Sequence, residues 1–204
     1  MPKGPSFAIE RGLPRPLAGV DEAGCGPLAG PVVAAAVILD RRRYPRGIDD
    51  SKRLSEADRD RLHVALRKTA AIGVGIVSVA EIEEINILNA RMVAMARAVE
   101  ALSVAPAMVL VDGNRAPDWH YDTRTIVRGD AVSRSIAAAS VIAKVTRDHI
   151  MLDLDRQHPL YGWRRNKGYP TPDHKRALDE FGPSPHHRRG FAPVRAALAK
   201  HRPS

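Results

Sequence analysis

The feature that most limits the fold of this chain is a pair of short apolar segments near its start. Residues 17–21 and 32–39 are mostly apolar, and a segment rich in glycine and proline separates them. Short apolar runs with such boundaries predict buried strands, and the short connection predicts a hairpin. Because the strands of a hairpin are antiparallel, a sheet that also contains parallel strands must be mixed.

Helical and strand patterns alternate along the rest of the chain. Ser55 has the form of a helix N-cap, and an Ala-rich helix is expected over residues 130–156, followed by a further helix from Thr171. Further strands are expected at 72–79, 108–111 and 125–127. The apolar stripe of another helix comprises Leu88, Met92, Met95, Val99 and Leu102. This order predicts an α/β protein with a mixed sheet.

The length of 204 residues fits one domain with an appendage. We expect an N-terminal tail (1–16), a catalytic core (17–156) and a basic C-terminal helical segment (157–204).

Residues 151–204 contain 11 Lys and Arg against 5 Asp and Glu, and so carry +6 of the net charge of +9. Aromatic residues alternate with bases between Tyr161 and Tyr169. This pattern favours nucleic acid, because rings stack on bases while cations neutralise phosphate.

A single cysteine, Cys25, excludes an internal disulfide and a multi-cysteine zinc site, which fits a reducing compartment. The longest apolar stretch, residues 31–39, is far shorter than the roughly 20 residues needed to cross a bilayer. We therefore expect a cytoplasmic protein that does not act at a membrane.

Four carboxylates lie where predicted strands or helices begin or end: Asp21, Glu22, Asp112 and Asp130. Oxygen ligands without histidine or cysteine suit Mg²⁺ or Mn²⁺, and two such ions would clamp both reacting oxygens of a phosphodiester. Adjacent strand residues point to opposite faces, so Asp21 and Glu22 share one pocket only if the chain turns at Glu22. Taken alone, Asp112 would form a simple turn with Gly113, and Asp130 would be a helix N-cap.

The glycine-rich turn at residues 24–30 also admits a nucleotide-binding interpretation. A strand rather than a helix follows it, however, and no Gly-Lys-Ser/Thr sequence is present. A backbone platform against a sugar or phosphate remains open.

Together these motifs resemble those of bacterial ribonuclease HII over about residues 17–195. The motifs are Asp21-Glu-Ala-Gly-Cys-Gly-Pro-Leu-Ala-Gly-Pro-Val32, Asp50-Ser-Lys52, Leu110-Val-Asp-Gly113, Gly129-Asp130 with Ser135-Ile-Ala-Ala-Ala-Ser-Val-Ile-Ala-Lys144, Lys167-Gly-Tyr169 and His187-Arg-Arg189. Six motifs in this order are far more specific than any one of them.

The resemblance implies a ribonuclease H-like fold with a central five-stranded mixed sheet, flanking helices and a small C-terminal helical part. It implies endonucleolytic cleavage of RNA in RNA/DNA hybrids and at single ribonucleotides in duplex DNA, leaving 3′-hydroxyl and 5′-phosphate ends. The four acids fall on the family's catalytic and metal-binding positions, for two Mg²⁺ or Mn²⁺ ions. The substrate-binding positions implied are Gly24, Cys25, Gly26, Lys52 and Tyr169, with Tyr169 stacking on a sugar and the glycines contacting the 2′-hydroxyl.

The sequence departs from the family pattern at three positions. Cys25 replaces the usual arginine, Asn166 a common histidine and Gly190 a common serine. A neutral thiol cannot make the charge-assisted phosphate contact of an arginine.

A weakened or non-catalytic nucleic-acid binder on the same fold is therefore one alternative, and a nucleotide-binding enzyme is another. The four acids favour the nuclease, because a pure binder gains nothing from carboxylates beside a polyanion. We expect a monomer, and the C-terminus has no sliding-clamp motif.

Overall fold

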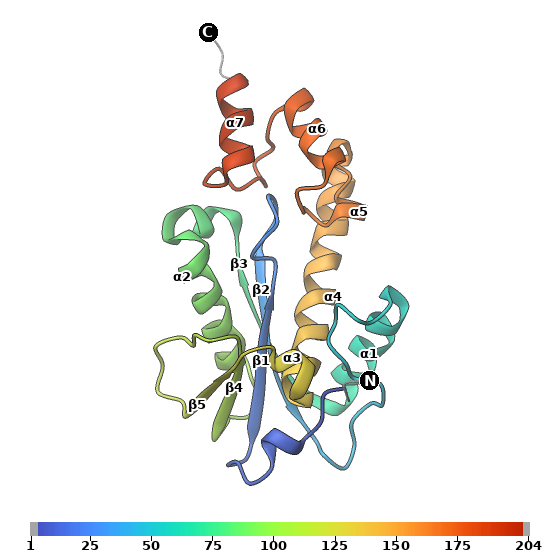
Figure 1. Ribbon diagram of the computed structural model, residues 1–204, viewed down its shortest axis with the longest axis vertical. Helices are drawn as coiled ribbons and strands as arrows, with labels where there is room; N and C mark the ends of the chain where they lie inside the picture. The colour runs from blue at the N-terminus through green and yellow to red at the C-terminus, as the bar shows by residue number, and fades with distance from the viewer. Residues whose placement is uncertain (1–3, 202–204) are drawn as a thin grey trace.

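The computed structural model describes residues 4–201, in which a five-stranded mixed sheet lies between helices (Figure 1). The strands are β1 (Leu17–Ala23), β2 (Val32–Leu39), β3 (Ala70–Val77), β4 (Met108–Asp112) and β5 (Thr123–Ile126). They are ordered β3-β2-β1-β4-β5. β1 to β3 form an antiparallel meander, whereas β4 pairs parallel with β1 and β5 parallel with β4. The predicted α/β class, hairpin and mixed sheet are thus confirmed.

Helices cover both faces of this sheet (Figure 1). The helices are α1 (Glu56–Thr69), α2 (Val79–Glu100), α3 (Gly129–Val132), α4 (Arg134–Gln157), α5 (Trp163–Asn166), α6 (Pro172–Phe181) and α7 (Ala192–Lys200), with short 3-10 turns at Ala8–Glu10 and Pro159–Tyr161. One core forms between the sheet and α2, and a second between the sheet, α1 and α4. Within residues 4–201, no helix is long and apolar enough to span a membrane.

Strands β1 and β5 have bounds that differ by one or two residues from those expected, and three further differences have a clear local cause. Strand β3 ends two residues early, because Ser78 caps α2 in a reciprocal capping box with Glu81. The helix expected over 130–156 is two helices, because Ser133 is extended and caps α4. Leu88, expected on the apolar stripe of α2, is 57% exposed, since the helix is interrupted just before it at Asn86.

The residues before β1 contact the core through Glu10. Its carboxylate is fully buried and accepts hydrogen bonds from the hydroxyls of Ser133 and Ser135 and from the backbone N–H of Ser135. A carboxylate at this position also complements the N-terminal dipole of α4. The N-terminal segment therefore helps to set where α4 begins.

The C-terminal segment buries two of its aromatic residues in a small core shared with Ala29 and Met151, which corrects the expectation that they stack on bases. Tyr161 and Trp163 are buried and stack on each other, with ring centroids 5.1 Å apart. His187 is also buried and lies 2.9 Å from His174, ring nitrogen to ring nitrogen. Of the three aromatic residues between positions 161 and 169, Tyr169 remains exposed and is available for stacking on a ligand.

Candidate active site

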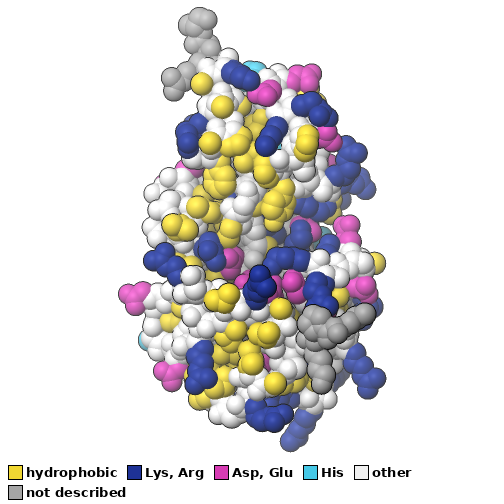
Figure 2. All heavy atoms as spheres, viewed as in Figure 1, with side chains coloured by type: hydrophobic (Ala, Val, Ile, Leu, Met, Phe, Trp, Pro, Cys, Tyr) yellow, Lys and Arg dark blue, Asp and Glu magenta, His cyan; other side chains and the backbone are white. Residues whose placement is uncertain are grey.

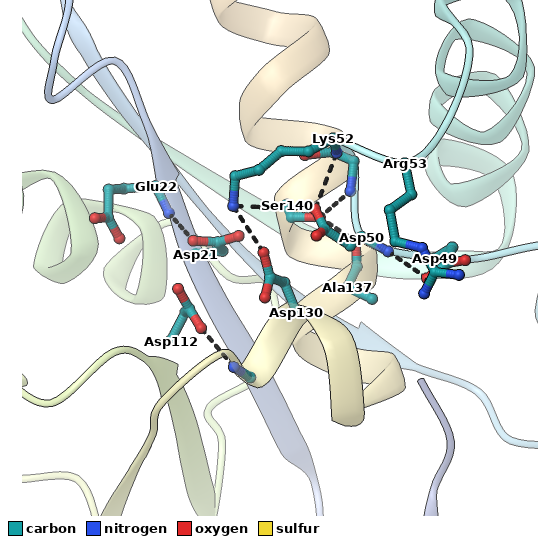
Figure 3. Close-up of polar contacts among 12 residues, drawn as sticks. Asp21, Glu22, Asp49, Asp50, Lys52, Arg53, Asp112, Asp130, Ala137 and Ser140 are labelled. Atoms are coloured by element: carbon teal, nitrogen blue, oxygen red, sulfur yellow. Dashed lines mark hydrogen bonds and ion pairs between the residues drawn. The ribbon is translucent and has the colours of Figure 1, made fainter. Parts of the chain in front are cut away.

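Three of the four predicted acids converge at one end of the central strands (Figure 3). Asp21 is in β1, Asp112 ends β4 and Asp130 lies in α3. One carboxylate oxygen from each lies within 4.8 Å of the others, a spacing at which a metal ion could be held. Parallel pairing of β1 with β4 places two of these carboxylates side by side, as expected for acids at the ends of neighbouring strands.

A close approach between β1 and the start of α4 brings the third aspartate to the other two. A Cβ atom on Gly19 would lie 2.2 Å from the backbone carbon of Ser135. No side chain fits there, so glycine allows the α3–α4 junction to lie directly on the strand. The junction is fixed further by the backbone N–H of Gly129, which donates to Asp112 Oδ1 at 2.6 Å.

Glu22 lies beside this cluster but its carboxylate pairs with a residue of α2. Strand β1 continues through Ala23 without a turn at Glu22. Asp21 and Glu22 nevertheless line the same cleft, so the expectation that sharing one pocket requires a turn is wrong. Asp21 points towards α4 and Glu22 towards α2, where Arg91 Nη2 lies 2.5 Å from Glu22 Oε1. The other oxygen, Oε2, is buried and has no hydrogen-bond partner within residues 4–201. That oxygen could accept a cation, and the role of Glu22 as a metal ligand stays a prediction.

A simple turn at Asp112 and a helix N-cap at Asp130 do not account for the contacts of these two side chains. Gly113 adopts a left-handed conformation, so a turn does follow Asp112. The Asp112 carboxylate also accepts a hydrogen bond from the backbone N–H of Gly129 and so fixes the start of α3. Asp130 is not a helix N-cap, because Arg128 occupies that position in α3. Its Oδ2 instead accepts a hydrogen bond from Lys52 Nζ at 2.9 Å (Figure 3).

The electrostatics of the cluster favour a bound cation. Burial, followed by the charges of Glu22 and Asp112, raises the pKa of Asp21 well above its ordinary value. Burial and Asp130 likewise raise the pKa of Asp112. Burial alone would lower the pKa of Lys52, but its hydrogen bond to Asp130 raises it overall, so the ammonium stays charged. One ammonium does not neutralise three carboxylates, and this donor set of hard oxygens fits Mg²⁺ or Mn²⁺.

The five predicted substrate-binding residues line one cleft of about 250 Å³ with three of the acids. The cleft is lined by Asp21, Glu22, Asp112, Gly24, Cys25, Gly26, Lys52 and Tyr169, together with Ala23, Ser51, Ser140 and Lys144. Gly26 lies against the ring of Tyr169, since a Cβ atom there would be 3.8 Å from the ring. The loop after β1 and the C-terminal segment therefore form opposite walls of one cleft.

The thiol of Cys25 is expected to be unreactive in this cleft. Burial, followed by the charge of Glu22, raises the pKa of its thiol to about 12. The thiolate that would act as a nucleophile is therefore scarce at neutral pH, as expected of an inert small residue in a turn.

Two features of the site were not predicted from the sequence. One is Arg91 on α2, which belongs to no recognisable motif, and the other is a second hollow next to the cleft. That hollow, of about 630 Å³, shares Lys144 with the cleft and is also lined by Arg59, Arg164, Arg165 and Lys167. Figure 2 shows acidic and basic side chains side by side across the middle of one face. The clustered bases of the C-terminal segment were the available signal for the hollow.

Comparisons with known proteins agree with this geometry. The family model for ribonuclease HII matches residues 18–194. A ribonuclease HII of Rhizorhabdus wittichii is 62% identical over 191 residues, covering 94% of this chain and 95% of the relative. The crystal structure of a ribonuclease H2 from Pyrococcus horikoshii superposes with a TM-score of 0.77 at 29% identity, covering 90% of this chain and 97% of the other. A ribonuclease HII from Archaeoglobus fulgidus, solved in complex with PCNA, has a TM-score of 0.68 at 25% identity and covers 86% and 94%.

Proposed function

This chain belongs to the ribonuclease HII family and is a ribonuclease H endonuclease, and from that premise we propose how its cleft selects and cuts a substrate. The proposed substrates are the RNA strand of RNA/DNA hybrids and single ribonucleotides within duplex DNA. The proposed products carry 3′-hydroxyl and 5′-phosphate ends.

The observation that carries this proposal is the convergence of three aspartates, two of which, Asp21 and Asp112, line a cleft together with a glycine loop and Tyr169. Asp21, Asp112 and Asp130 would hold divalent ions, Mg²⁺ or Mn²⁺, and Glu22 would supply a further oxygen from its unpartnered Oε2. Two such ions, when bound, would supply the positive charge that activates a water molecule and stabilises the leaving oxygen.

The remaining cleft residues would bind and orient the nucleic acid. Gly24 and Gly26 present backbone rather than side chains to a sugar, and the 2′-hydroxyl is the group that separates RNA from DNA. Tyr169, being exposed, is free to stack on that sugar. Lys52 lies within hydrogen-bonding distance of Asp130 and would bring a positive charge to the scissile phosphate. We also propose that the protein acts as a monomer.

A single cleavage assay tests this function. Three labelled duplexes are compared, namely DNA with one internal ribonucleotide, an RNA/DNA hybrid and all-DNA, each with Mg²⁺, Mn²⁺ or a chelator. We expect metal-dependent cleavage of the first two and none of the third. Tight binding of the duplexes without cleavage under any metal condition would instead support the non-catalytic alternative.

A further inference from the structure

Two buried arginines lie beneath the glycine loop that lines the cleft. Arg147 on α4 is 1% exposed, and Arg188, between α6 and α7, is fully buried. Neither guanidinium forms an ion pair with a carboxylate among residues 4–201. Buried charges without an ionic partner are costly, by several kcal/mol each, unless hydrogen bonds satisfy them. Such positions call for a specific explanation.

Both guanidiniums donate their hydrogen bonds to backbone carbonyls. Arg188 donates to the carbonyls of Gly24, Cys25, Pro27, Gly30 and Pro31, over distances of 2.6 to 3.2 Å. Arg147 donates to the carbonyls of Ala29 and Pro31, at 2.9 and 3.0 Å, and to that of Lys167 at 2.9 Å. The backbone N–H of Arg188 also donates to the Leu28 carbonyl at 2.8 Å. Nearly every carbonyl from residue 24 to 31 is therefore turned inward.

This arrangement dictates where the N–H groups of the loop point. In a trans peptide the N–H lies opposite the preceding carbonyl. Because the carbonyls of Gly24 and Cys25 face Arg188, the N–H groups of Cys25 and Gly26 face the other way. Neither N–H donates a hydrogen bond within the described part of the chain, and both residues line the cleft. Successive outward N–H groups form a concave site for an electron-rich oxygen.

The same contacts explain the glycine at position 24. Its φ is +98°, and a Cβ atom there would lie 2.2 Å from Arg147 Nε. The loop thus approaches the buried guanidinium as closely as its backbone allows. Burial and the charge of Arg147 lower the pKa of Arg188 to about 9, which still leaves it charged at neutral pH.

We propose that Arg147 and Arg188 are positioning residues that hold the backbone of residues 24–26 in the conformation that selects a ribonucleotide, without touching the substrate themselves. The inference rests on the proposed function, because it assumes that the loop faces the sugar of the substrate. It assigns to two buried side chains a part in the selectivity proposed for the loop.

The test compares binding selectivity in a cleavage-defective Asp21→Asn background. Arg188→Lys and, separately, Arg147→Lys keep the positive charge but lose the planar array of donors. The matched control is Arg189→Lys, because Arg189 is adjacent to Arg188 but exposed. Fluorescence anisotropy gives the Kd for a duplex with one ribonucleotide and for the same duplex in DNA alone, and thermal melting reports folding.

We expect the ratio of the two Kd values to fall about tenfold in Arg188→Lys, since a displacement of about 1 Å is enough to cost that much. Binding to all-DNA should change little, and Arg189→Lys should keep the parental ratio. An unchanged ratio in a folded Arg188→Lys or Arg147→Lys protein overturns the inference, as does an equal loss of affinity for both duplexes. If Arg188→Lys does not fold, Arg147→Lys decides alone. Absence of any preference in the Asp21→Asn background also overturns the inference, because there is then no selectivity for the arginines to maintain. Failure of the unaltered protein to cleave either RNA-containing duplex overturns the proposed function, so the two failures are distinguishable.

Discussion

The carboxylate of Asp21 is buried beside Asp112 and Asp130, so its charge is unfavourable for the folded protein until a cation binds. Burial, followed by Glu22 and Asp112, raises its pKa in the folded state. A raised folded-state pKa means that the folded protein holds this proton more tightly than the unfolded chain. The resulting stabilisation is present below the ordinary pKa of an aspartate and is lost as pH rises through the folded-state pKa.

We therefore expect Asp21→Asn to abolish cleavage while stabilising the metal-free protein at pH 7, by about 1 kcal/mol, or a few degrees in Tm. Thermal unfolding in chelator at pH 7 and pH 4 measures the second effect, which should shrink at pH 4 because Asp21 of the parent is then protonated. Asp153→Asn, at an exposed position, is the control. Normal turnover in Asp21→Asn would remove Asp21 from the metal site.

Cys25 stands where the resemblance implies an arginine. The Sγ atom lies 3.7 Å from Glu22 Oε1 and lines the cleft. We expect Cys25→Arg to tighten binding of a ribonucleotide-containing duplex by roughly 1 to 3 kcal/mol, the scale of a charge-assisted hydrogen bond. The cleaved bond should stay the same, since the backbone of the loop is unaltered. Cys25→Ser is the control, and binding titrations with product mapping provide the measurement. Unchanged affinity in Cys25→Arg would show that this side chain does not face a phosphate.

At the scale of elements, strand β1 presents its two acids to different neighbours, although both line the same cleft. Asp21 joins the cluster beside α4, whereas Glu22 meets Arg91 of α2 at 2.5 Å. Because α2 supplies this cation, the helix competes with any metal ion for the carboxylate of Glu22.

Removing that competitor should change the metal requirement. We expect Arg91→Met to lower the Mn²⁺ concentration for half-maximal cleavage several-fold, since about 1 kcal/mol of ion pairing is a factor of about five. Arg97→Met is the matched control, because Arg97 pairs with Glu81 on the same helix, away from the cleft. A metal dependence identical to that of the parent would count against Glu22 as a ligand.

For the whole molecule, the C-terminal segment forms part of the candidate cleft rather than a detachable basic tail. Arg188 holds the loop after β1, Ala29 forms a β-bridge with His187, and the N–H of Leu28 donates to the Gly168 carbonyl. A truncation near residue 157 would therefore expose this loop and its buried arginines. Point substitutions in the second hollow, next to the cleft, therefore test better how its positive charge contributes to binding.

We expect nucleic-acid binding to weaken steeply as the salt concentration rises. In the double variant Arg164→Gln, Arg165→Gln, the slope of log binding constant against log salt concentration should be shallower by about 0.9 for each phosphate that is no longer neutralised. Both residues line the hollow that adjoins the cleft. The change should leave Tm unaltered. Arg42→Gln with Arg43→Gln, removing two charges from the loop after β2, is the control. A slope equal to that of the parent would show that no phosphate reaches the hollow.

The sequence by itself determined the strands, most helix boundaries and the identity of the acids, because these depend on local patterns of apolar residues, caps and turns. The interval from Val32 to Leu39 is a strand over its whole predicted length, and Thr171 caps α6 as its spacing indicates. The approach of Asp21 to Asp112 also followed, since the ends of neighbouring parallel strands meet at one edge of a sheet, whereas Asp130 reaches them through the packing of α3 and α4 against Gly19.

Only the tertiary structure decided which partner each side chain meets. The pairing of Glu22 with Arg91, the burial of Tyr161 and Trp163, and the inward donors of Arg147 and Arg188 all join segments far apart in the chain. An arginine that binds phosphate and an arginine that binds backbone carbonyls have the same side chain in the sequence. They differ in solvent exposure and in the geometry of their acceptors, which arise only when distant elements pack together.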